Sequence, residues 1–317
     1  MLKKYKPIVI VSGEPESTFL EIFIKALKYK NFKSPLILIC SLDLIKKEIK
    51  RLKFKKKIKL LNVKNLDSIK INNDCINLIN VSFNNQKKNK SKYIETSFNL
   101  AFKLVKEKFT NKFINGPINK KDFLKKKFLG ITEFVSKKFD VKKTAMLIFN
   151  KEISVCPITT HLPLKVVPNK IDKKLIIEKT KLIDDFYKKH IGFKPRIAVT
   201  GLNPHCESVG NFNEDEKIIA PSVKHLRSKG YRIEGPYAAD TIFLKQNRVK
   251  YDVILGMYHD QVLTPFKTLK EYDAINITIG LPFFRISPDH GPNKKMFKKN
   301  LSNPLSIIRA IEFLDRK

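Results

Sequence analysis

The sequence predicts an α/β fold in which helices cover both faces of a largely parallel sheet. Short apolar runs of four or five residues alternate with amphipathic stretches along the first half of the chain, and the second half repeats the pattern. Buried parallel strands give such runs, and the helices between them give the amphipathic stretches. A chain of 317 residues predicts one large domain or two medium ones.

The first half of the chain is expected to alternate strands with helices. Apolar residues such as Phe19, Phe23 and Leu27 recur at helical spacing. The Lys- and Asn-rich segment 84–93 is interpreted as a loop. In chain order, the expected elements are a strand at 8–12, a helix at 19–28, a strand at 36–40, helices at 42–54 and 96–108, and a strand at 113–114.

The second half is expected to continue in the same style. Acidic residues open a predicted helix at 214–230, and Gly230 closes it. A domain boundary is expected within 115–135. The other expected elements are strands at 153–160, 196–202, 253–255 and 275–279 and helices at 173–189 and 304–314.

The charge of the chain is strongly positive, at +34 from 64 basic and 30 acidic residues. A dedicated nucleic-acid binder is nevertheless not expected, because 56 of the basic residues are lysine and only 8 are arginine. Arginine is the residue that specific phosphate and base recognition favours. We interpret the lysines as spread over solvated faces, from which they attract phosphorylated small molecules.

The chain shows no sign of export or membrane insertion. No window of about 18 apolar residues is present, and the N-terminus lacks the pattern of a signal peptide. Cys40, Cys75, Cys156 and Cys206 have no CxxC spacing, so we expect reduced thiols. These observations predict a cytoplasmic protein with no membrane partner.

Three histidines follow strand-like runs by a few residues: His161, His205 and His259. In an open α/β sheet the carboxyl ends of the strands line the ligand crevice. Three histidines at that edge suit a catalytic metal, which takes three protein ligands and keeps one position open. The alternative is that each histidine is separately hydrogen-bonded where its strand ends.

Further polar residues accumulate near His259. Asp260 is a candidate to orient a ligand histidine or to act as a base. Arg285 lies among apolar residues and needs an anionic partner, either a substrate carboxylate or phosphate or an internal carboxylate. Thr132 stands at an expected helix start, where it either helps to bind an anion or simply caps the helix. The chain has neither a GxGxxG nor a GxxxxGK[ST] motif, so it predicts no standard nucleotide-binding loop.

These segments, taken in order, resemble the 4-hydroxythreonine-4-phosphate dehydrogenase family of pyridoxal phosphate biosynthesis. The resemblance runs from about residue 110 to 291. It is carried by GPINK (116–120), GxTEF (130–134), THLPL (160–164), GLNPH (201–205), GPYAADTIF (235–243), MYHDQ (257–261), NITIGLPFFR (276–285) and DHG (289–291).

The resemblance implies a two-domain α/β/α fold of the isocitrate and isopropylmalate dehydrogenase type. Residues 1–125 and 286–317 would form the first domain and residues 126–285 the second, with the active site in the cleft between them. It implies a homodimer with the site near the subunit interface. It also implies oxidation of 4-phosphohydroxy-L-threonine with NAD or NADP, followed by decarboxylation to 3-amino-2-oxopropyl phosphate.

The resemblance also assigns expected roles to individual residues. The metal ligands would be His161, His205 and His259, with zinc preferred and magnesium, manganese or cobalt as alternatives. Catalytic roles would fall to Asp260 and Lys267, and cofactor contacts to His290 and Gly291. Substrate contacts are expected from Thr132, Lys267, Asn276, Arg285 and Asp240.

The chain departs from the family pattern at several places. Ile131 stands where the family has a histidine, so one polar contact is missing. The N-terminal loop 13–21, the segment 206–211 and the segment 292–304 also differ. Two alternatives therefore stay open: a related dehydrogenase of another phosphorylated hydroxy acid, such as a four-carbon sugar-acid phosphate, and an inactive homologue that only binds.

Overall fold

The computed structural model describes residues 5–317 except 85–88, 120–122, 124–127, 129 and 209–211. The chain forms two compact units. The first comprises Met1–Phe128, Tyr272–Ile275 and Pro282–Lys317, and the second Leu129–Glu271 and Asn276–Leu281. The domain boundaries expected from the sequence, at 125/126 and 285/286, stay a prediction.

The sheet of the first unit is parallel, with strands in the order β3-β4-β2-β1-β5-β12. β1 and β2 are buried along their whole length, as the short apolar runs predicted. The strands are β1 (Ile8–Val11), β2 (Leu36–Cys40), β3 (Ile58–Leu60), β4 (Ile76–Asn80), β5 (Lys112–Asn115) and β12 (Phe284–Pro288).

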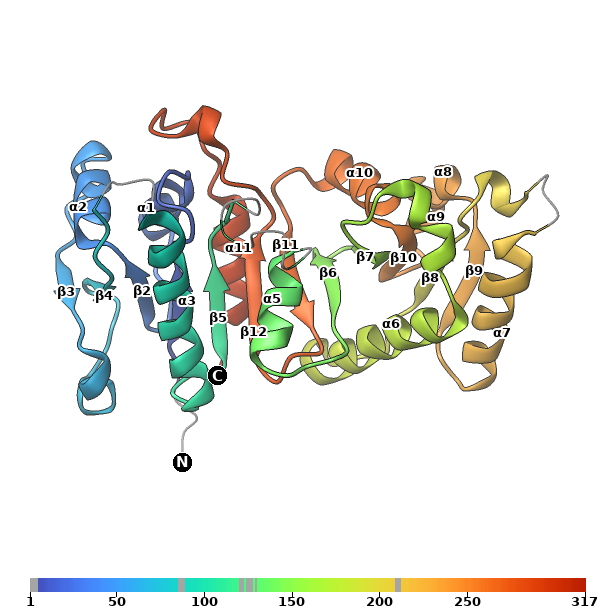
Figure 1. Cartoon of the computed structure of the whole chain (residues 1–317), viewed down its shortest axis with the longest axis horizontal. Helices are drawn as coiled ribbons and strands as arrows, with labels where there is room; N and C mark the ends of the chain where they lie inside the picture. Colours follow the sequence, from blue (N-terminus) through green and yellow to red (C-terminus); the bar gives the residue numbers. More distant parts are fainter. Residues whose placement is uncertain (1–4, 85–88, 120–122, 124–127, 129, 209–211) are drawn as a thin grey trace. The chain divides into compact units, whose positions relative to one another are not determined.

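Helices cover both faces of this sheet. Figure 1 shows α3 in front of the central strands, and α11 behind β5 and β12. The helices of the unit are α1 (Phe19–Tyr29), α2 (Leu42–Arg51), α3 (Lys90–Lys106) and α11 (Leu305–Leu314), and the short 3-10 turns are η1 (Val63–Ser68) and η8 (Lys294–Met296).

The second unit has strands in the order β11-β6-β7-β10-β8-β9. β7, β10, β8 and β9 run parallel, and β6 is antiparallel to β7. The strands are β6 (Ala145–Phe149), β7 (Ser154–Thr159), β8 (Ile197–Thr200), β9 (Ile233–Tyr237), β10 (Val253–Tyr258) and β11 (Ile275–Ile279).

Helices connect the strands of this second unit. α10 packs against β7 and β10, α6 against β6 and β7, and α7 against β9. The helices are α5 (Ile131–Lys138), α6 (Lys173–Phe186), α7 (Ala220–Ser228), α8 (Ala239–Ile242), α9 (Lys245–Arg248) and α10 (His259–Lys270). The shorter turns are η3 (Leu164–Val166), η4 (Pro168–Lys170), η5 (Tyr187–Ile191), η6 (Pro204–Cys206) and η7 (Asp215–Ile219).

The prediction of an α/β fold is confirmed, and two local interpretations are wrong. The segment 84–93 is not a loop throughout, because α3 already begins at Lys90; residues 85–88 lie outside the described part. Thr132 does not cap its helix, because α5 begins at Ile131 with Gly130 at the N-cap.

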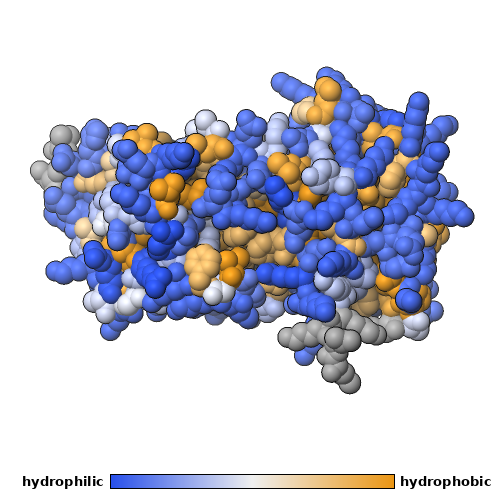
Figure 2. Space-filling model, turned by 180° about the vertical axis from the view of Figure 1, so that it is seen from behind, coloured by the Kyte–Doolittle hydropathy of each residue, from blue (hydrophilic) through white to orange (hydrophobic). Residues whose placement is uncertain are grey.

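The surface carries mostly hydrophilic side chains. Figure 2 shows one face on which apolar side chains occur only in small separate groups. This distribution agrees with the interpretation of the lysines as solvated. Among the helices of the described residues, none combines the length and hydropathy that crossing a bilayer requires.

Candidate functional site

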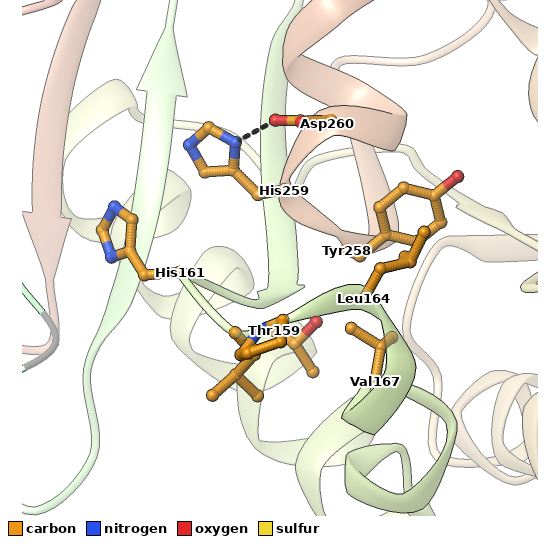
Figure 3. Close-up of a pocket in the computed structure, with 9 residues that line it drawn as sticks. Thr159, His161, Leu164, Val167, Tyr258, His259 and Asp260 are labelled. Atoms are coloured by element: carbon orange, nitrogen blue, oxygen red, sulfur yellow. Dashed lines mark hydrogen bonds and ion pairs between the residues drawn. The ribbon is translucent and has the colours of Figure 1, made fainter.

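Two of the three expected metal ligands meet at one edge of the second unit's sheet. β7 and β10 are neighbouring parallel strands, with Thr159 paired to Tyr258. His161 follows the end of β7, and His259 directly follows the end of β10. Their ring centres lie 5.5 Å apart, and Figure 3 shows the two rings side by side. The carboxyl ends of two neighbouring strands therefore bring these two side chains together.

Asp260 fixes the orientation of the His259 ring. Its Oδ1 lies 2.6 Å from His259 Nδ1. His259 is the first residue of α10, and Asp260 is the second. A carboxylate on one ring nitrogen sets the tautomer and leaves the other nitrogen, Nε2, to bind a ligand. Figure 3 shows Tyr258 pointing away from both rings, toward Leu164.

Gln261 links β10 to the loop that follows β8. Its Oε1 accepts hydrogen bonds from Thr200 Oγ1 and Met257 N, each at 2.7 Å. Its Nε2 donates to Gly201 O at 2.7 Å. No pattern in the sequence predicted a role for this amide, which fixes the start of the loop that carries His205.

His205 lies on that loop, exposed, with a positive φ of 55°. The loop is tied down by the buried Asp215, which accepts hydrogen bonds from the backbone N–H groups of Leu202 (2.7 Å) and Asn203 (3.1 Å). Burial, followed by the nearby charge of Asp215, raises the pKa of the Cys206 thiol. Cys206 is therefore a neutral thiol at neutral pH.

The residues present fit a metal ion in part. An imidazole bound at 2.0–2.1 Å has its ring centre about 3 Å from the metal, so two imidazoles at a tetrahedral angle have centres about 5 Å apart. The pair His161 and His259, at 5.5 Å, matches this spacing. Within the described residues, no three His, Cys, Asp or Glu side chains form a group that could hold a metal ion. His205 is thus not grouped with the other two in the single chain.

A pocket of about 460 Å³ adjoins the two histidines. It is wide enough for a small phosphorylated metabolite. Figure 3 shows its lining, which consists of Thr159, His161, Leu162, Pro163, Leu164, Val167, Tyr258, His259 and Asp260.

The first turn of α5 borders His161. A Cβ built on Gly130 would lie 2.9 Å from Glu133 Oε2 and 3.0 Å from both Cε1 and Nδ1 of His161. The carboxylate and the ring therefore face the same point, and their nearest atoms are within about 6 Å of each other. Thr160 Oγ1 lies 3.4 Å from Glu133 Oε1. No pattern in the sequence assigned a role to Glu133, which lies within the GxTEF motif (130–134).

The other expected substrate residues of the second unit are spread over three elements. Thr132 Oγ1 lies 3.4 Å from Thr278 Oγ1 of β11. Asn276, also on β11, has a buried Oδ1 without a hydrogen-bond partner among the described residues. Lys267 is exposed near the end of α10, and Asp240 is exposed on α8.

The remaining expected residues belong to the first unit. Arg285, on β12, is 0% exposed, and its Nε donates a hydrogen bond to Asn115 Oδ1 at 2.7 Å. His290 Nδ1 lies 2.9 Å from Gly291 O. A Cβ on Gly291 would meet open space. Arg285 thus contacts a neutral amide at the carboxyl end of β5, and its expected anion stays a prediction.

Comparisons with known proteins give a consistent result. Residues 31–314 match the family model described as "Pyridoxal phosphate biosynthetic protein PdxA". The 4-hydroxythreonine-4-phosphate dehydrogenase of Sulfurihydrogenibium sp. (strain YO3AOP1) is 38% identical over 325 residues, which cover 96% of each chain. The solved structure of the enzyme of that name from Klebsiella pneumoniae matches with a TM-score of 0.80 and 26% identity over 98% of each chain.

A more distant neighbour shares the fold alone. It is a terephthalate 1,2-cis-dihydrodiol dehydrogenase from Burkholderia xenovorans LB400, with a TM-score of 0.61 and 18% identity. The alignment covers 98% of this chain and 97% of the neighbour. The arrangement of strands and helices therefore extends to proteins with little sequence in common.

Proposed function

Because the chain belongs to the family of the pyridoxal phosphate biosynthetic protein PdxA, we propose that it is a 4-hydroxythreonine-4-phosphate dehydrogenase. The substrate would be 4-phosphohydroxy-L-threonine, and NAD or NADP would accept the hydride. Loss of carbon dioxide would then give 3-amino-2-oxopropyl phosphate. The observation that carries the proposal is the pair His161 and His259, with Asp260 behind it, at the carboxyl edge of the sheet.

The chemistry of the site supports a divalent cation on this pair. Imidazole nitrogens suit zinc best, and magnesium, manganese and cobalt are the alternatives. When bound, such an ion lowers the pKa of the substrate's hydroxyl group and polarises the carbonyl group that forms from it. His161 and His259 would hold the ion, and Asp260 would keep His259 in the tautomer with Nε2 free. His205 is the proposed third ligand.

The anionic ends of the substrate need cationic partners. Lys267 and Arg285 are the proposed partners, and Thr132 and Asn276 would add neutral hydrogen bonds. The buried Oδ1 of Asn276 has no hydrogen-bond partner among the described residues, which supports a contact with a donor on the substrate. Asp260 and Lys267 are also the candidates to move protons during oxidation and decarboxylation. His290 and Gly291 are proposed to contact the cofactor.

We further propose that the enzyme works as a homodimer in the cytoplasm. The exposed position of His205 leaves it accessible to a second copy of the chain. A phosphorylated amino acid carries charges that keep it from crossing a membrane, so its enzyme is expected where the substrate is made. Light scattering coupled to size-exclusion chromatography would measure the first point, and a mass of one chain would contradict it.

The proposed function is tested by NAD(P) reduction with 4-phosphohydroxy-L-threonine in the metal-loaded protein. His259→Ala should abolish activity and lower the bound metal, since a three-histidine site loses one ligand. His225→Ala, on α7 in the same unit, is the matched control and should keep both. Wild-type protein that is folded and holds metal but reduces neither cofactor would refute the proposal.

A second candidate substrate is the four-carbon phosphate that carries a hydroxyl group in place of the amino group. It is favoured by Ile131, which is half-buried at the start of α5 where the family has a histidine. Ile131 cannot form the polar contact that a histidine would provide. Turnover of this compound at a rate equal to that of the amino compound would support the second candidate.

A further inference from the structure

We propose that Glu133 binds the ammonium group of the substrate and so decides between the amino compound and its hydroxyl counterpart. The inference deepens the proposed function and rests on it. It starts from a carboxylate oxygen that the second unit buries beside His161 and leaves without a hydrogen-bond partner among the described residues.

One carboxylate oxygen of Glu133 accepts a hydrogen bond within the second unit, and the other has no hydrogen-bond partner among the described residues. Glu133 is the third residue of α5, so its side chain starts from the first helical turn. Oε1 accepts a hydrogen bond from Thr160 Oγ1 at 3.4 Å. Oε2 is buried and has no such partner in the described part of the chain. A buried polar atom without a hydrogen-bond partner costs about 1–3 kcal/mol. A ligand that donates a hydrogen bond to Oε2 would remove this cost.

This oxygen, which has no hydrogen-bond partner among the described residues, lies beside His161, where a substrate held by the histidine pair would meet it. Gly130 has no side chain, and the space of its missing Cβ is bordered by Glu133 Oε2 at 2.9 Å and by the His161 ring at 3.0 Å. A cation of ammonium size on Oε2 would therefore lie within a few ångströms of the histidine pair. Such proximity is needed for an amino group that neighbours the reacting hydroxyl carbon.

Two other carboxylates of the second unit, Asp260 and Asp240, are less suited to binding the ammonium group. Asp260 already contacts His259 Nδ1 at 2.6 Å, and its side chain is 81% exposed. Asp240 is exposed on α8. An ion pair with an exposed carboxylate is weak, whereas a buried carboxylate oxygen forms a strong hydrogen bond with an ammonium group. Glu133 is the half-buried carboxylate that borders His161.

The test compares the binding of two ligands by calorimetry in the metal-loaded protein. One ligand is 4-phosphohydroxy-L-threonine, and the other carries a hydroxyl group in place of the amino group. Glu133→Gln keeps the shape but removes the charge. We expect it to weaken binding of the amino compound about 10- to 100-fold, the worth of a charge-assisted hydrogen bond, and to change binding of the hydroxyl compound by less than about threefold.

The control is Glu107→Gln, which removes the same charge from an exposed position at the end of α3. It should leave both affinities unchanged. Equal weakening of both ligands by Glu133→Gln would overturn the inference, because Glu133 would then act through His161 or the fold. Unchanged binding of the amino compound would overturn it as well.

Binding also separates this inference from the proposed function. A wild-type protein that binds the amino compound but reduces no NAD(P) would refute the dehydrogenase activity, and the ratio of the two affinities would still test Glu133. A wild-type protein that binds neither ligand would refute both the proposed function and the role of Glu133.

Discussion

Glu21 is the centre of an ion network that joins two helices of the first unit to the segment after β12. Its carboxylate is 2% exposed. Oε1 accepts hydrogen bonds from Lys25 Nζ at 3.0 Å and from the backbone N–H of Ser302 at 2.9 Å. Oε2 accepts one from Arg51 Nη2 at 2.8 Å. Arg51 Nη1 also donates to Lys298 O at 3.0 Å, so the network fixes residues 298–302.

We predict that Glu21→Gln lowers the free energy of unfolding by about 2–3 kcal/mol. Hydrogen bonds to a charged group contribute about 1.5–3 kcal/mol each. The low end applies here because the Lys25 and Arg51 side chains are each 23% exposed. Glutamine keeps one accepting oxygen, but its NH₂ group cannot accept from the guanidinium. The melting temperature should fall by roughly 4–10 °C.

Thermal and urea unfolding followed by circular dichroism would measure the loss. Glu107→Gln is the control, because its exposed pair with Lys103 should contribute less than about 1 kcal/mol. A loss in Glu21→Gln no larger than in this control would refute the reasoning. It would mean that the donors around Glu21 find water or other acceptors at no cost.

The same network predicts a pH dependence. Burial alone would raise the pKa of the Glu21 carboxyl group, but the Ser302 N–H and the charges of Lys25 and Arg51 bring it below its usual value. A carboxyl group with a lowered pKa stabilises the fold fully above its unfolded value, about 4.3, and loses this contribution as the pH falls through the folded value. The difference between wild type and Glu21→Gln should therefore be constant near neutral pH and shrink below about pH 4.

Two further predictions concern buried polar groups. Gln261→Met removes the hydrogen bonds to Thr200 and to the loop 201–206. It should lower the free energy of unfolding by about 2–3 kcal/mol. A midpoint of urea unfolding equal to that of the control Gln246→Met would contradict this. Burial lowers the pKa of Lys112 to about 8 in the folded protein. Between this value and the higher pKa of the unfolded chain, the folded protein has lost the proton while the unfolded chain still holds it, so stability rises with pH. Wild type should therefore gain stability relative to Lys112→Met between pH 8 and 10, and a difference that stays constant over this range would rule the idea out.

The sequence predicted the buried strands well because burial on both faces leaves an uninterrupted apolar run. β2 and β11 have the expected bounds, 36–40 and 275–279. The start of α3 was missed for the opposite reason. Tyr93, Ser97 and Ala101 form a buried stripe at helical spacing, but the lysines and asparagines around Tyr93 suggested a loop. Lysine is a good helix former, so composition alone was a poor guide.

The sequence likewise predicted the positions of some residues of the candidate site and not of others. Strand ends predicted that His161 and His259 share an edge, because a parallel sheet brings the carboxyl ends of its strands together. The same reasoning placed His205 at this edge too, but within the described residues of the single chain it is not grouped with the other two. Its loop depends on a positive φ and on the carboxylate of Asp215, which no strand pattern predicts. Glu133 lies beside His161 because the folded chain brings both side chains close to Gly130, which has no side chain of its own. This proximity arises only in the folded chain, so the sequence did not predict it.

The three residues that follow β10 have different roles although they are adjacent in the sequence. Successive residues of a helix point about 100° apart, so His259, Asp260 and Gln261 at the start of α10 face different surroundings. Asp260 contacts the His259 ring, whereas Gln261 reaches the loop after β8. Replacing Asp260 should therefore alter the orientation of the His259 ring, and replacing Gln261 should alter the neighbouring loop. A histidine, a carboxylate and an amide follow the strand because the first is a proposed ligand, the second orients its ring and the third holds the neighbouring loop.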